Sequence, residues 1–138
     1  MTSEPSFLSV DDVLAIHARM IAEFGGDSGL RDRGLLESAV HMPSAQFGGR
    51  YLHEGLAAMA AAYLFHLCLN HPFIDGKKRV ALGAAEIFLQ VNGLRLKATD
   101  AQVADLTIGV AEGRISKAEA TAFFARRVAR DIKRRNRR

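Results

Sequence analysis

Cysteine, tryptophan and long apolar runs are scarce in this 138-residue chain, which has one cysteine, no tryptophan and three prolines. The lone Cys68 excludes an internal disulfide and a cysteine-based zinc site, as is typical of proteins in a reducing cytoplasm. The longest nearly apolar run, Leu56 to Leu69, is shorter than the roughly 20 residues needed to span a bilayer. No secretory signal is visible from Met1 to Val10. We therefore expect a cytoplasmic protein with no membrane partner.

Basic charge is concentrated at the C-terminal end of the chain. The sequence has 19 Lys and Arg against 15 Asp and Glu, for a net charge of +4. Eight of the basic residues and one acid fall in residues 126–138, which leaves 11 basic and 14 acidic residues in 1–125. We expect a folded domain over 1–125 and a basic helical extension or tail over 126–138. Nucleic acid is not expected as a partner except through this tail, whose alternative interpretation is a solvated helix end.

Apolar residues recur at helical spacing along most of the chain, and Ala and Leu dominate. Residues 54–70 are apolar nearly all round, which is typical of a helix in the middle of a bundle. The predicted helices cover Val10 to Phe24, Asp32 to just before Pro43, Glu54 to Asn70, Gly76 or Lys77 to Val91, Thr99 to Gly113, and Ser116 to Val128 or Ile132. This pattern predicts an all-α, single-domain bundle of about six helices.

Residues 44–53 contain glycines and polar side chains without a firm period. We expect a flexible loop or short hairpin here, before the central helix. Loops of this kind often carry binding residues, so it is a candidate flap for docking a substrate.

The segment His71-Pro72-Phe73-Ile74-Asp75-Gly76-Lys77-Lys78-Arg79 places three cations in the predicted first turn of a helix. A helix N-terminus is the positive end of the helix dipole, so each cation there costs roughly 0.3–1 kcal/mol. Three such cations in succession indicate an anionic ligand, and phosphate is the obvious candidate. The segment is not a Walker A loop, because the Gly-x4-Gly-Lys-Ser/Thr spacing is absent.

Each residue of this segment has a possible chemical role and a structural alternative. Gly76 allows backbone N–H groups to approach a ligand, and Lys77, Lys78 and Arg79 supply charge, unless the cations form only a solvated face. Asp75 suits Mg²⁺, or is only an N-cap. His71 suits a general base, or is only a structural histidine.

Structural interpretations are preferred for the other polar residues of interest. Arg31 and Asp32 are expected to form a local ion pair or a helix cap, and His66 is expected to pack beside Tyr63 and Phe65. His17, His41 and His53 show no constellation in the sequence.

The segment from His71 to Arg79 closely resembles the motif of the Fic/Doc (Fido) family, His-x-Phe-x-Asp/Glu-Gly/Ala-Asn-Gly/Lys-Arg. The variant of the motif with a lysine, here Lys78, just before the final Arg resembles that of the death-on-curing (Doc) branch, whose members are the toxins of toxin–antitoxin pairs. Further segments that resemble this family are Phe24-Gly25-Gly26, residues 29–39, Asn70-His71, Phe88-Leu89, Asn92-Gly93 and residues 111–113.

The resemblance implies a Fido fold and a role for each matching residue. His71 would be the base that activates a target hydroxyl, Asp75 would bind Mg²⁺, and the anion cradle would consist of Gly76, Lys78 and Arg79, with Lys77 beside them. It further implies a Doc-type kinase that transfers the γ-phosphate of ATP to a protein such as elongation factor Tu, with a cognate antitoxin as partner.

Lys77 stands where the family usually has Asn. A lysine is longer than the neutral amide, charged, and only a hydrogen-bond donor. It either adds phosphate affinity, fills the anion site itself, or repels Mg²⁺. Two alternatives to the kinase stay open: AMP transfer, the reaction of ordinary Fic proteins, and a binding protein whose catalysis Lys77 impairs.

Overall fold

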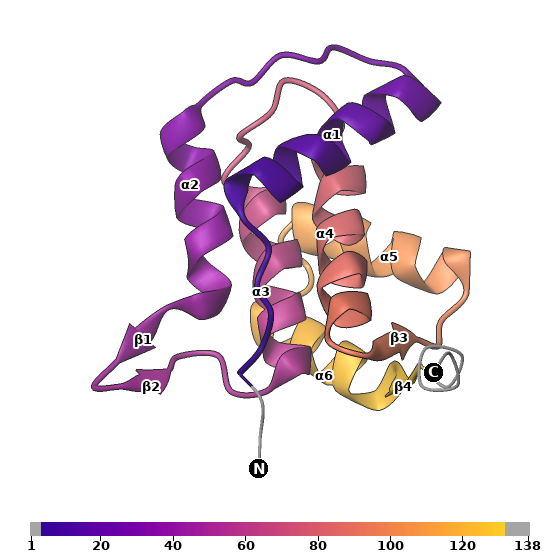
Figure 1. Ribbon diagram of the computed structural model, residues 1–138. Helices are drawn as coiled ribbons and strands as arrows, with labels where there is room; N and C mark the ends of the chain where they lie inside the picture. Colours follow the sequence, from indigo (N-terminus) through magenta and orange to yellow (C-terminus); the bar gives the residue numbers. More distant parts are fainter. Residues whose placement is uncertain (1–3, 132–138) are drawn as a thin grey trace, which may run out of the picture.

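The computed structural model describes residues 4–131, which form a helical bundle with two small antiparallel sheets (Figure 1). The six helices are α1 (Val10–Phe24), α2 (Arg33–His41), α3 (Leu56–Leu69), α4 (Lys77–Val91), α5 (Asp100–Ala111) and α6 (Lys117–Arg127). A 3₁₀ turn, η1 (Met42–Ser44), follows α2. The predicted all-α, single-domain bundle of six helices is thus confirmed.

Short-range side-chain caps account for the helix starts. Capping boxes are present at Ser9, Thr99 and Ser116, and each hydroxyl accepts the N–H of the residue three positions on. Asp32 caps α2 by accepting the N–H of Leu35 at 2.9 Å. Because these caps depend only on local sequence, the predicted starts agree with the structure.

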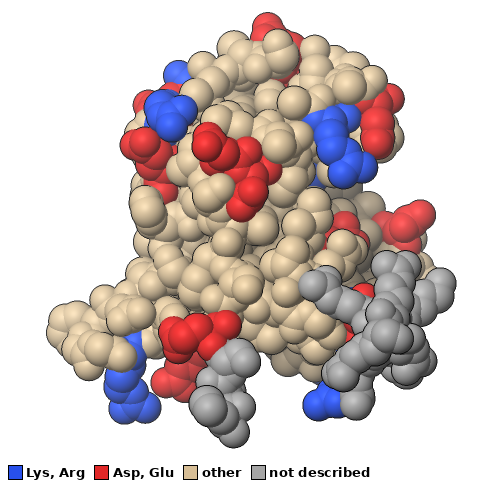
Figure 2. All heavy atoms as spheres, viewed as in Figure 1, with Lys and Arg blue, Asp and Glu red and all other residues tan. Residues whose placement is uncertain are grey.

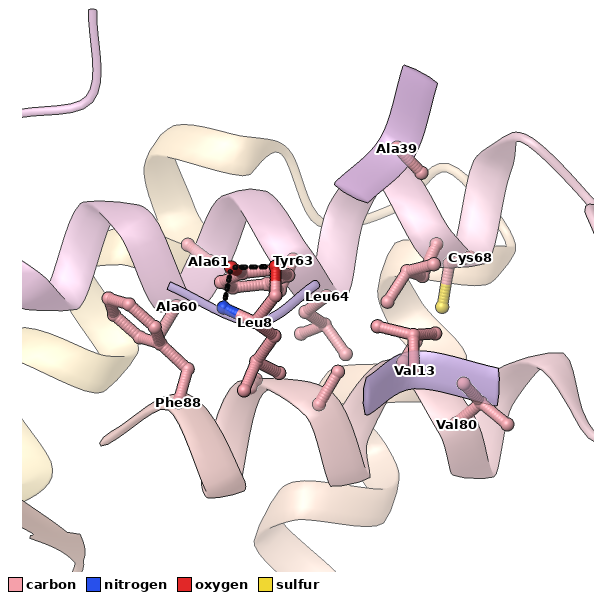
Figure 3. Packing of buried hydrophobic residues seen from close by; sticks show 14 of the residues in the cluster. Leu8, Val13, Ala39, Ala60, Ala61, Tyr63, Leu64, Cys68, Val80 and Phe88 are labelled. Atoms are coloured by element: carbon pink, nitrogen blue, oxygen red, sulfur yellow. Dashed lines mark hydrogen bonds between the residues drawn. The ribbon is translucent and has the colours of Figure 1, made fainter. Parts of the chain in front are cut away.

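Helix α3 is the centre of the bundle, as its apolar sequence predicted. It packs against α4 on one side and α6 on another, with α2 and α5 also in contact. Its residues from Met59 to Leu64 are almost completely buried, and Figure 3 shows several of them against Val13 and Phe88. Burial of α3 on all sides fixes where its C-terminal end lies, and therefore where the loop to α4 begins.

The segment before α3 is a hairpin, which decides between the two predicted possibilities. Strands β1 (Gln46–Phe47) and β2 (Arg50–Tyr51) pair antiparallel. Gly48 and Gly49 join them with φ of 61° and 78°, the left-handed values that a tight two-residue hairpin turn requires. Phe47 is 80% exposed at the tip of the hairpin.

Residues 126–138 were predicted to be a helical extension or tail, and the structure corrects the helical alternative at Val128–Arg130. Helix α6 ends at Arg127, and β4 (Val128–Arg130) then pairs antiparallel with β3 (Leu94–Leu96). The N–H of Lys97 donates to the Arg127 carbonyl at 2.6 Å, so the exposed edge of β3 draws the chain out of helical geometry. Residues 132–138 of the predicted tail lie outside the described residues.

Charged side chains are dispersed on the face seen in Figure 2, where Lys and Arg do not gather into one patch outside the grey atoms. None of the helices within residues 4–131 is both long enough and apolar enough to cross a bilayer.

A buried hydrogen bond ties the N-terminal segment to α3, and it yields a stability prediction. The N–H of Leu8 donates to the hydroxyl of the fully buried Tyr63 at 2.8 Å (Figure 3). In Tyr63→Phe this N–H loses its acceptor, and we expect the free energy of unfolding to fall by about 1–3 kcal/mol. Urea denaturation measures the change. Tyr51→Phe is the matched control, because the Tyr51 hydroxyl bonds Glu4 in an exposed position; an equal loss in both variants would contradict the prediction.

Candidate active site

One cavity of about 940 Å³ lies where the loop between α3 and α4 meets the first turn of α4. The predicted site residues, His71, Asp75, Gly76, Lys77, Lys78 and Arg79, all line this cavity. Arg31 from the α1–α2 loop adds a further cation, and the far wall is formed by Leu82 of α4 with Ala104, Thr107 and Ile108 of α5. The cavity therefore has a cationic end at the start of α4 and a largely apolar end at α5.

The N-terminus of α4 faces this cavity without a side-chain cap. Gly76 is the N-cap residue, with a φ of 79°, and no side chain among residues 4–131 caps the first turn. A residue with a side chain is disfavoured at this φ, which explains the glycine. Asp75 is therefore not an N-cap, and the first N–H groups of α4 are available to an anion.

The Asp75 carboxylate is held by the α1–α2 loop: its Oδ2 atom accepts the N–H of Asp27 at 3.0 Å. In the described part of the chain, no group of three or more His, Cys, Asp or Glu residues could hold a metal ion. A single carboxylate such as that of Asp75 fits Mg²⁺, which keeps several waters and is commonly bound by one or two carboxylates together with substrate phosphates. Asp75 would be its protein ligand.

Two of the three cations at the start of α4 already have partners. The Arg79 guanidinium lies 4.3 Å from the centre of the Phe24 ring, a cation–π contact that directs it across the end of α1. Lys77 Nζ lies 2.5 Å from Nδ1 of His71 and 3.4 Å from Nε2. Lys78 is exposed beside them.

The Lys77 contact governs the proton on His71. A charged lysine only donates, so Nδ1 accepts and the proton of the neutral ring resides on Nε2. Desolvation lowers the pKa of His71, and the Lys77 and Arg31 cations lower it further. The lowered pKa favours the neutral ring, and its Nε2, which carries the proton, is not free to accept another while Lys77 stays in place.

The comparison with known proteins agrees with this geometry. The model of the Fic/DOC family matches residues 7–89, more than half of the chain. The chain belongs to this family. It is 45% identical over 92 residues to "Toxin Doc" of Mycolicibacterium smegmatis, an alignment that covers 67% of this chain and 68% of that protein. It is 33% identical over 109 residues to "Protein kinase doc" of Escherichia phage P1, covering 79% and 85% of the two chains.

Arg31 contributes to this candidate site and not to a local ion pair, whereas the expected helix cap is supplied by Asp32. Its Nε donates to the His71 carbonyl at 2.6 Å, and its Nη2 donates to the Asn70 carbonyl at 3.3 Å. His71 has a φ of 49°, a left-handed value that is uncommon for a residue other than glycine. Arg31 therefore supports the backbone of His71 in an unfavourable conformation.

Two of the three histidines without a predicted constellation, His17 and His53, have tertiary partners. His17 of α1 bonds the loop that carries Asp75, at 2.9 Å from the Asp75 carbonyl. His53 and His66 converge on Lys117, whose Nζ lies 3.0 Å and 3.2 Å from their Nε2 atoms. His66 also packs edge-on against Phe65, as expected. These contacts join residues 51 to 64 positions apart, so no local spacing could have indicated them.

Removal of the Lys77 charge tests the account of His71. In Lys77→Met we expect the pKa of His71 to rise, because a neighbouring cation that opposes protonation is gone. An NMR titration of the His71 ring protons measures it. Lys78→Met removes an equal charge from the next residue, and should raise the pKa less. An unchanged pKa in Lys77→Met would contradict the account.

His66 yields a prediction for the pH dependence of stability. Desolvation, followed by the charges of Lys117 and His53, lowers its pKa from 6.5 to about 4. Between these values the unfolded chain binds a proton that the folded chain does not, so stability falls as the pH falls. In His66→Gln, urea denaturation should show a smaller loss of stability between pH 7 and about pH 4. His41→Gln, which replaces an exposed imidazole, should keep the wild-type loss; an undiminished loss in His66→Gln would refute the interpretation.

Proposed function

We propose that this protein is a Doc-type toxin that transfers the γ-phosphate of ATP to a hydroxyl of a protein target, such as elongation factor Tu. The observation that carries the proposal is the cavity in which His71 faces the uncapped start of α4 and its three cations. The similarity to Doc proteins, one of them named a protein kinase, supports the same reaction class.

Residues of this cavity could bind the phosphates, bind Mg²⁺ and accept a proton, the three tasks that phosphoryl transfer requires. The first N–H groups of α4, with Lys78 and Arg79, would hold phosphate oxygens through charge-assisted hydrogen bonds. Asp75 would hold Mg²⁺, which when bound neutralises charge on the phosphates. His71 would accept the proton of the attacking hydroxyl, and this requires that Lys77 move from the ring to the phosphate.

The proposed partner in the cell is a cognate antitoxin, and the proposed compartment is the cytoplasm. A toxin that stops translation must be held inactive until it is needed. The wide opening between the start of α4 and the apolar side chains of α5 could accommodate a segment of such a partner.

A specific observation favours a second candidate, a nucleotide-binding protein with impaired catalysis. Lys77 donates to Nδ1 of His71, so the ring proton is on Nε2. With the proton on Nδ1 instead, Nε2 would be the free base. If phosphate does not attract Lys77 away from His71, the ligand binds but no proton is accepted.

Incubation with α-labelled or γ-labelled ATP, Mg²⁺ and purified elongation factor Tu separates these possibilities. We expect label on the protein target from the γ position alone, and none with His71→Ala, which lacks the base. Label from the α position would mean AMP transfer and would refute the kinase. Label from neither position, with ATP still bound, would support the impaired protein.

Lys77→Asn tests the origin of any impairment. The neutral amide cannot hold Nδ1 as a charged donor does, so γ-label transfer should rise above that of the wild type. Lys78→Asn removes an equal charge without touching the described contact with His71, and should not increase transfer. Equal transfer by the wild type and Lys77→Asn would show that Lys77 is compatible with full activity.

A further inference from the structure

His17 is a buried polar residue to which no function has yet been given. It lies on α1 with only 4% of its surface exposed. Its ring stacks on the Phe73 ring, with centroids 3.9 Å apart and planes within 9°. Its Nε2 is 2.9 Å from the Asp75 carbonyl oxygen, which can only accept, so the imidazole donates.

This hydrogen bond acts at the entry to α4. The Asp75 carbonyl belongs to the peptide that joins Asp75 to Gly76, the residue at which the chain turns into the helix. Gly76 also lies close to the imidazole, because a Cβ built there would be 3.7 Å from His17 Nε2. The orientation of this peptide decides where the Gly76 N–H and the following N–H groups point.

The ring is itself held in place, so the donor has a defined direction. Its stacking partner Phe73 is 3% exposed, and Val13 and Ile16, which precede His17 on α1, belong to the core. On the opposite side of the Asp75 residue, the N–H of Asp27 holds the carboxylate. The residue is thus fixed at two points, its carbonyl by α1 and its side chain by the α1–α2 loop.

We propose that His17 is a positioning residue. By fixing the Asp75–Gly76 peptide, it aligns the Asp75 carboxylate and the start of α4 with a nucleoside triphosphate and its Mg²⁺. The inference rests on the proposed function for the identity of the ligand. A purely structural role would require only an apolar ring against Phe73, whereas the positioning role requires the donor.

Two substitutions separate the ring from the donor. His17→Phe keeps a ring on Phe73 and removes the donor, and His17→Gln removes the ring and keeps an N–H near the place of Nε2. We expect the dissociation constant for ATP with Mg²⁺, measured by calorimetry, to rise about 10- to 100-fold in His17→Phe. His17→Gln should recover most of the affinity. The kcat of transfer should fall in His17→Phe while the KM for the protein target stays constant.

Controls make the outcome decisive. His41→Phe makes the same substitution at an exposed histidine, and should bind ATP as the wild type does. Circular dichroism and thermal unfolding report whether each variant is folded. If His17→Phe is not folded, His17→Asn replaces it, because its amide is one methylene shorter than that of His17→Gln and cannot reach the carbonyl equally well.

The possible failures are distinguishable. Unweakened ATP binding by folded His17→Phe, or equal losses in His17→Phe and His17→Gln, would overturn the positioning role alone; equal binding by His17→Asn and His17→Gln would do the same. Weakened binding in His17→Phe without label transfer by any variant would support the positioning role and overturn the kinase. No binding of ATP by the wild type would overturn both.

Discussion

The loop between α3 and α4 is shaped by its hydrogen bonds to the segment between α1 and α2, and the candidate site depends on this attachment. The N–H groups of Arg31 and Asp32 both donate to the Pro72 carbonyl, at 2.8 and 3.1 Å. The N–H of Ile74 donates to the Gly29 carbonyl at 3.2 Å. An exposed loop of this length would otherwise sample many conformations, so the chemistry of one segment depends on the backbone of another.

Close packing of α3 and α4 supports the two ends of that loop. Both helices present small side chains, including Ala60 and Ala61 of α3 and Ala81 and Ala84 of α4, and all four are fully buried. Small residues let helix axes approach closely and leave little freedom for sliding. The loop therefore starts and ends at fixed points, and the α1–α2 segment has only to set its path between them.

Local patterns were enough to predict most of the helices and the residues that line the cationic end of the cavity. Ser116 and Glu119 are three residues apart, so their capping box can be read from the sequence, and the residues from His71 to Arg79 are contiguous. Contacts between distant segments could not be predicted in this way. Arg31 meets His71 from 40 residues away, and the pairing of β4 with β3 overrides a helical pattern that continues through Val128. These depend on the tertiary arrangement, which periodicity does not encode.

Both ends of the described chain converge at the end of α4 that is remote from Lys77. Ser6 and Asn92 are joined by two hydrogen bonds, and the N–H of Asp131 donates to the Gly93 carbonyl at 2.9 Å. Helix α4 has 15 residues, so this junction is about 22 Å from the cationic turn. A partner that binds at this junction would therefore lie on the far side of the molecule from the cationic turn, and would leave the mouth of the cavity open to a ligand as large as a folded protein.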